Sequence, residues 1–153
     1  MLKSLPLLMA VVAALFASPT AAIGRDLVAH KLSNEDTLAI DRKSDDFFAL
    51  LKQGQPDNAV KNLLGTTGLM EGKKSELTQL SNQIASSLDI YGPISDCFLV
   101  QRDGRGGVVE EQQFICTHSK LASRWKRLFI KTANGWIAGN LYFDDRVMAE
   151  KEP

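Results

Sequence analysis

Hydrophobic residues change their spacing near the middle of this chain. In the first half they recur every three or four positions, and Leu77, Leu80, Ile84 and Leu88 form the clearest stripe of this kind. After Gly92-Pro93 they alternate with polar residues. The first spacing is typical of an amphipathic helix and the second of a half-buried strand. The pattern therefore predicts helices followed by strands, which is an α+β arrangement.

The pattern predicts three helices. The first covers residues 37–53 and is followed by Gly54, a common residue after a helix C-terminus. The second begins at Pro56, a residue favoured in the first turn, and ends near residue 65. The third carries the stripe described above and ends at Gly92-Pro93.

Four antiparallel strands are predicted over residues 94–103, 108–118, 121–131 and 136–143. Glycines separate the first two strands, and Asn134-Gly135 is a favoured two-residue turn between the last two. Residues 37–145 then form one domain. Residues 23–36 are expected to be a flexible lead-in, and residues 146–153 a C-terminal tail.

The first 22 residues have the order of a secretory signal peptide. Lys3 gives a positive start, residues 5–17 are uncharged and mostly apolar, and Thr20-Ala21-Ala22 supplies small residues for cleavage before Ile23. The apolar run is shorter than the roughly twenty residues of a spanning helix. We therefore expect a protein that is secreted or periplasmic, and the alternative is an uncleaved N-terminal anchor.

Charge and size narrow the function classes. The chain has 18 Lys and Arg residues and 18 Asp and Glu residues. Removing residues 1–22, which hold only Lys3 as a charged residue, leaves one excess negative charge. A near-neutral surface has no large field to attract nucleic acid, so no nucleic-acid partner is expected. The remaining 131 of 153 residues suffice for one compact domain.

The two cysteines are predicted to form a structural disulfide. If Gly106-Gly107 is a two-residue turn, Cys97 lies directly opposite Cys116 on the neighbouring strand, within reach of a bridge. An exported chain meets an oxidising environment. The spacing differs from that of C-x-x-C redox motifs, which disfavours a redox pair, and two buried free thiols are the other alternative. With no cysteine at the cleavage point, a lipid anchor there is excluded.

Alternation across the last predicted hairpin separates two faces. With Asn134-Gly135 as the turn, one face is almost purely apolar and is expected to pack on the third helix. The other combines large aromatic residues with cationic ones, a composition typical of interfaces. We expect this second face to point outward as a dimer or partner surface; the alternative is that arginine and lysine stems cover the rings of a monomer. The first face holds Leu128, Ile130, Ile137, Leu141 and Phe143, and the second Trp125, Arg127, Phe129, Lys131, Trp136, Asn140 and Tyr142.

No motif in the chain assembles a catalytic or metal site. His30 and His118 are far apart, so no metal ion is expected. A trio of Ser119, His118 and an aspartate lacks a nucleophile-elbow motif. Asp96 lies among apolar neighbours on the first strand, where burial would raise its pKa and suit it as a base. A solvated position at the start of the strand is the favoured interpretation for Asp96.

Two segments carry a family resemblance: Asp46-Phe47-Phe48-Ala49-Leu50-Leu51-Lys52-Gln53-Gly54 before the short second helix, and the closing Asn134-Gly135-Trp136 strand, which ends in Asp144-Asp145. Over residues 37–145 the chain resembles the superfamily of nuclear transport factor 2 and ketosteroid isomerase. The resemblance implies a curved four-stranded antiparallel sheet packed around the helices like a cone, often with a pocket at its mouth. It also implies frequent homodimers, and no single activity.

We therefore expect an exported, non-enzymatic domain that binds a small apolar ligand or a protein partner, without a cofactor. The alternative is a small-molecule isomerase or hydrolase with an aspartate base in the cone pocket, for which Asp96 is the candidate. A third hypothesis is a structural envelope protein that acts through its dimer face.

Overall fold

The computed structural model describes residues 32–147. Three helices come first: α1 (Asn34–Lys52), α2 (Pro56–Leu64) and α3 (Lys74–Tyr91), with a short 3-10 helix η1 (Gly68–Met70) before α3. Four strands follow: β1 (Ile94–Arg105), β2 (Val109–His118), β3 (Ala122–Thr132) and β4 (Gly135–Asp144). The predicted α+β class, with three helices before four antiparallel strands, is confirmed.

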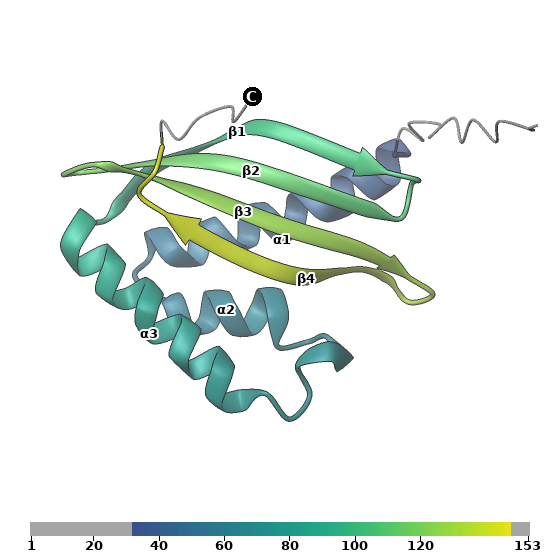
Figure 1. Ribbon diagram of the computed structural model, residues 1–153, viewed down its shortest axis with the longest axis horizontal. Coiled ribbons are helices and arrows are strands. Elements are labelled where there is room, and N and C mark those ends of the chain that lie inside the picture. Colours follow the sequence, from purple (N-terminus) through teal and green to yellow (C-terminus); the bar gives the residue numbers. More distant parts are fainter. Residues whose placement is uncertain (1–31, 148–153) are drawn as a thin grey trace, which may run out of the picture.

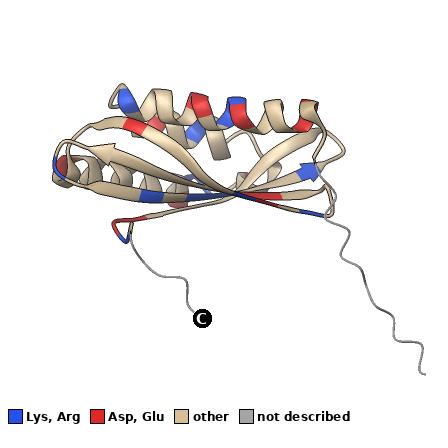
Figure 2. Ribbon diagram, turned by 90° about the horizontal axis from the view of Figure 1, so that it is seen from above, with Lys and Arg blue, Asp and Glu red and all other residues tan. Residues whose placement is uncertain are grey.

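The strands form one antiparallel sheet in the order β1-β2-β3-β4. Helix α1 runs along one side of the sheet, α2 packs against α1 and β4, and α3 packs against α2 (Figure 1). Seen from above, α1 lies over one side of the sheet, and the far side carries no helix of the described chain (Figure 2). We call this uncovered side the open face.

Helix α1 begins three residues earlier than predicted because Ser33 caps it. The Ser33 Oγ accepts a hydrogen bond from the Asp36 backbone N–H at 3.0 Å, which satisfies one of the free donors of the first turn. Residues 33–36, which were expected to belong to a flexible lead-in, are thus the cap and the first turn of α1. The earlier part of the expected lead-in, the expected signal peptide, His30 and the end of the expected C-terminal tail fall outside the described residues. Among residues 32–147, no helix is long and apolar enough to cross a membrane.

The core lies between α1, α2 and the covered side of the sheet. Aromatic rings dominate it: Phe47 and Phe48 of α1 meet Trp125 of β3 edge to face, with ring centroids 5.8 and 5.9 Å apart. Phe143 of β4 stacks on Trp125 at 4.7 Å. Such contacts add to the free energy of simple burial. The fully or nearly buried members are Ile40, Phe47, Phe48, Leu51, Ala59, Val60, Leu63, Leu64, Ile84, Ile94, Phe114, Cys116, Trp125, Phe129, Trp136, Ala138 and Leu141.

The predicted disulfide is confirmed, although the predicted turn is not. Cys97 lies opposite Cys116 and is bonded to it. The connection actually starts after Arg105, which pairs with Val109, so it is one residue longer than a Gly106-Gly107 turn. A bulge between Leu99 and Gln101 adds one residue to β1 and restores the pairing that the shorter turn would have given.

The β3–β4 hairpin corrects the predicted faces. Thr132 pairs with Gly135, so the turn is Ala133-Asn134, and a bulge at Gly139 shifts the pairing beyond it. The side chains of Trp136 and Ala138 before the bulge, and Leu141 after it, are all buried. Leu141 and Phe143 thus join Trp125, Phe129 and Trp136 on the covered side, whereas Leu128, Ile130 and Ile137 lie on the open face.

Candidate functional site

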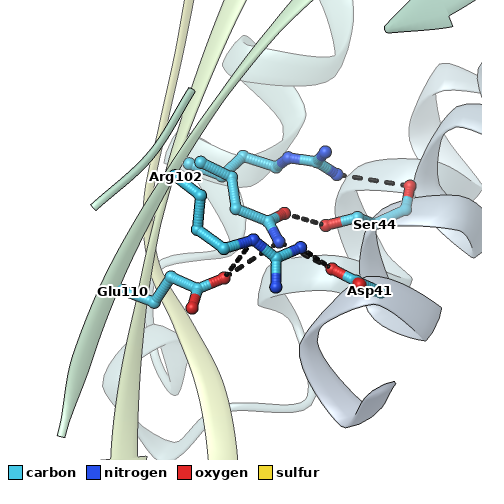
Figure 3. Close-up of polar contacts among 6 residues, drawn as sticks. Asp41, Ser44, Arg102 and Glu110 are labelled. Atoms are coloured by element: carbon cyan, nitrogen blue, oxygen red, sulfur yellow. Dashed lines mark hydrogen bonds and ion pairs between the residues drawn. The ribbon is translucent and has the colours of Figure 1, made fainter. Parts of the chain in front are cut away.

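A cluster of polar side chains lies between α1 and the covered side of the sheet (Figure 3). Asp41 and Ser44 come from α1, where a spacing of three residues puts them on one face of the helix. Arg102 comes from β1, and Glu110 and Gln112 from β2. We call these residues, together with Arg127 of β3, the polar cluster. The cluster joins one helix to three strands.

Gln112 is the centre of the hydrogen bonds in this cluster. Its Oε1 accepts from the Ser44 Oγ at 2.6 Å, and its Nε2 donates to Asp41 Oδ1 at 2.8 Å and to Glu110 Oε1 at 3.1 Å. The amide oxygen and both amide N–H groups therefore have partners. Gln112 is fully buried, so replacing it would leave several groups without partners.

Arg102 closes the outer end of the cluster. Its Nη2 donates to Asp41 Oδ1, and its Nε lies 3.4 Å from Glu110 Oε1. Arg102 and Asp41 are partly exposed, whereas the Glu110 side chain is 1% exposed. The Arg102 guanidinium therefore bridges the carboxylate of Asp41, near the solvent, and that of Glu110, in the protein interior.

Burial changes the acidity of Glu110. Loss of solvent raises the pKa of this carboxyl, Asp41 raises it further, and the attraction of Arg102 and the Gln112 hydrogen bond oppose the rise. Within the described residues, Glu110 Oε2 has no hydrogen-bond partner. Glu110 is therefore a carboxyl that takes up a proton more readily than an exposed glutamate.

Arg127 is buried among aromatic rings. Its guanidinium carbon lies 4.3 Å from the ring centroids of both Phe48 and Phe114 and 5.5 Å from that of Phe47. Its Nη1 donates to the Ser44 backbone oxygen at 3.2 Å, while its Nε and Nη2 have no partner in the described chain. Burial lowers the pKa of Arg127 to about 9, so the group stays charged at neutral pH. The ring faces supply an attraction that partly replaces lost hydration.

The cluster contains two arginines and two carboxylates, buried at Glu110 and Arg127 and reaching solvent at Arg102 and Asp41. The charges of these four groups cancel. In residues 32–147 no group of three or more His, Cys, Asp or Glu side chains is placed to hold a metal ion. Sequence reasoning missed Glu110, Gln112 and Arg102 as site residues. The available signal was strand alternation, which puts Glu110 and Gln112 on the same face as Cys116.

The residues predicted as an outward aromatic surface divide into two groups. Trp125, Arg127, Phe129 and Trp136 are buried, at most 6% exposed, so the expectation that they form an exposed surface is wrong. Trp125 packs against Phe47 and Phe48 of α1. Burying large aromatic side chains removes more apolar area from water than burying the aliphatic face would. Asn140 and Tyr142 are exposed on the open face, and for them an interface role stays a prediction.

Asp96 does not lie in a buried pocket. Its side chain is 67% exposed, and its Oδ1 is 3.3 Å from the Lys52 Nζ. This placement contradicts the desolvated setting that a raised pKa would require and agrees with the solvated interpretation. The resemblance predicted a pocket at the mouth of a cone. The structure instead shows an open hollow of about 770 Å³ in the helical layer, between the end of α2, η1 and the start of α3.

His118 is part of a different buried network. Its Nδ1 lies 2.8 Å from the Gly92 carbonyl, which can only accept, so Nδ1 carries the proton. Its Nε2 then accepts from the Ser123 Oγ at 2.7 Å, and that oxygen accepts from the Trp125 indole N–H at 2.7 Å. The partner of His118 is thus Ser123 rather than Ser119, and both are tied into the fold.

The open face presents a second candidate. Val109, Ile130 and Ile137 are direct cross-strand neighbours on β2, β3 and β4, and Leu128 lies two residues along β3. We call these four residues the aliphatic patch. Each remains partly exposed. Contiguous apolar side chains on an uncovered surface are typical of binding sites.

Comparison with known proteins gives no relative for this chain: no family model, no curated protein and no solved structure matches it. Membership of the superfamily of nuclear transport factor 2 and ketosteroid isomerase therefore stays a prediction from the residues that carry the resemblance.

Proposed function

We propose that this protein is an exported, non-enzymatic interaction domain that binds a protein partner through the open face of its sheet. One observation carries the proposal: the helices leave one side of the sheet uncovered (Figure 2), and that side bears the aliphatic patch, as the strand pairing shows. The helices bury only one face of the sheet. The free energy falls when a partner removes the apolar side chains of the other face from water.

The chemistry of the open face favours a protein over a small ligand. The aliphatic patch lies toward the turn after β3, while Lys126, Tyr142 and the pair Arg124–Asp144 lie toward the other end. Arg124 Nη2 and Asp144 Oδ2 are 2.6 Å apart. An apolar region bordered by polar groups over three strands resembles a protein interface. Small ligands bind in concave sites, and the side of the sheet facing the helices is filled by large buried side chains such as Trp125.

Export is proposed from the leader-like first 22 residues. The Cys97–Cys116 bridge supports it because structural disulfides persist in oxidising compartments. A partner in the envelope or outside the cell fits this location.

The test places a photo-crosslinking amino acid at Ile137 on the open face and, as a control, at Gln83 on the exposed side of α3. We expect a discrete adduct from Ile137 and none from Gln83 when both variants are irradiated in the producing cells. The adducted protein is then identified, purified and titrated against the parent and against Ile137→Lys. We expect the substitution to weaken binding by roughly tenfold or more, because it places a charge on the apolar surface.

Equal adducts from the two positions, or unchanged affinity of Ile137→Lys, would contradict the proposal. Circular dichroism of Ile137→Lys checks that the fold is retained.

A further inference from the structure

We infer that two copies of this chain pair through the free edge of β1, as antiparallel strands that join the two sheets into one. Strand β1 is 12 residues long and lies at the end of the sheet (Figure 1). No other strand of residues 32–147 pairs with its outer edge. An edge of this length presents a row of backbone donors and acceptors to another chain.

The pairing with β2 identifies the backbone groups that point outward. The Cα atoms of Cys97 and Cys116 are 4.0 Å apart, the close spacing of a non-hydrogen-bonded pair. In such a pair the N–H and C=O groups point away from the neighbouring strand. Alternation along β2 extends this arrangement to the pairs that contain Leu99, Arg102 and Gly104. The free edge therefore offers backbone groups at residues 97, 99, 102 and 104.

Side chains in the middle of this edge do not protect it. Phe98, Leu99 and Val100 are consecutive apolar residues, 56%, 41% and 52% exposed. Edge strands are commonly shielded by lysine, proline, bulges or inward charges. Between Asp96 and Arg102 the strand has no proline and no charged residue, and the bulge after Leu99 is the one such device in this stretch. This stretch is both exposed and able to pair.

A second copy fits the edge in one symmetrical alignment. When Cys97 faces Gly104 and Leu99 faces Arg102 of the other chain, all the outward groups meet, and the bulges between Leu99 and Gln101 lie at the two-fold axis. Asp96 then faces Arg105 at both ends of the paired strands. Both side chains are exposed, and the bond from Asp96 to Lys52 lies at the surface. Opposite charges at matching ends favour this self-pairing over other registers.

Two-fold pairing also limits the assembly to a dimer, since each β1 edge is used once. The axis lies perpendicular to the sheet, so both helical layers are on one side and the two open faces are continuous on the other. The inference is independent of the proposed function, and the dimer would double the surface available to a partner.

The test measures the mass of the protein purified from cells that express the full chain, using light scattering after size exclusion. We expect about twice the mass of one chain for the parent. Asp96→Arg and Arg105→Asp each place like charges opposite one another, so each alone should weaken dimerisation roughly tenfold or more. Mixing these two variants restores opposite charges at both ends, and we expect the mixture to form a dimer.

Two controls separate this edge from other surfaces. Asp89→Arg reverses an exposed charge on α3, and Ile137→Lys changes the open face; both should remain dimeric. A monomeric parent, dimers of both single variants, or a mixture that stays monomeric would each overturn the inference. Loss of the dimer in Ile137→Lys would assign self-association to the open face instead. Thermal unfolding of each variant confirms that it folds.

Discussion

The guanidinium carbon of Arg127 lies 4.3 Å from the ring centroid of Phe48, so a charged group of β3 and an aromatic ring of α1 share the interior. Its Nη1 also donates to the Ser44 backbone oxygen. The arginine thus holds the helix to the sheet by a ring face and by one hydrogen bond. Buried charges are costly to desolvate, so this contact fixes the position of α1 more than it adds stability.

Arg127→Ala should lower the free energy of unfolding by about 3 kcal/mol, because it leaves a cavity among three rings. Arg127→Met should cost less than about 1.5 kcal/mol, since it refills the space and removes the buried charge. Urea unfolding measures both. An equal loss in the two variants would show that the charge, rather than the volume, carries the stability.

The disulfide gives a second prediction. Cys97→Ala with Cys116→Ala should cost about 3 kcal/mol, because the bridge closes a loop in the unfolded chain between residues that are 19 positions apart. Reduced parent protein is the control. Its free energy of unfolding should equal that of the double variant within about 1 kcal/mol. A double variant as stable as the oxidised parent would contradict the expected structural role.

The raised pKa of Glu110 predicts a pH effect with a definite sign. Between the unfolded pKa and the raised folded pKa, the native state binds more protons than the unfolded state. Glu110 therefore contributes stability at low pH that is lost as the pH rises through its folded pKa. Glu110→Gln should remove this part of the pH dependence. Urea midpoints measured from pH 4 to 8 test the difference, and parallel curves for the two proteins would contradict it.

Gly139 is predicted to be sensitive to a single added methyl group. A Cβ at this position would lie 2.8 Å from Ile130 Cδ1, so Gly139→Ala should cost about 1 kcal/mol through overpacking. Ile130→Val removes the opposing atom. In a double-mutant cycle, the pair should therefore be less destabilised than the two single changes added together. Simple additivity would mean that the backbone at the bulge, and not Ile130, opposes the methyl group.

Spacing alone predicted the order of the elements because periodicity reports local structure. The bounds of α1 depended on the Ser33 cap, which begins the helix earlier than its apolar residues indicate. The cysteine pairing was correct although the turn was one residue longer than assumed, because the bulge in β1 compensates. A correct long-range contact can therefore follow from two local differences that cancel.

The faces of the last hairpin were predicted wrongly for two reasons. The bulge at Gly139 moves Leu141 and Phe143 to the face that holds Trp125. Alternation along β3 also separates two faces without showing which of them meets the helices. The inward place of Arg127 depends on Phe48 and Ser44, which are about eighty residues away along the chain. The polar cluster was missed for the same reason: its members come from four separate elements, and only the fold brings them together.

The bulge at Gly139 also determines where β4 can tolerate the deletion of one residue. Strand β4 holds one residue more there than the segment of β3 that it pairs with. Deleting Gly139 leaves Leu141 and Phe143 facing the helices and Tyr142 facing solvent, because the surplus position alone disappears. Deleting a residue nearer the end of the strand would turn the following side chains over. Length variation in close homologues should therefore be confined to this one position of β4.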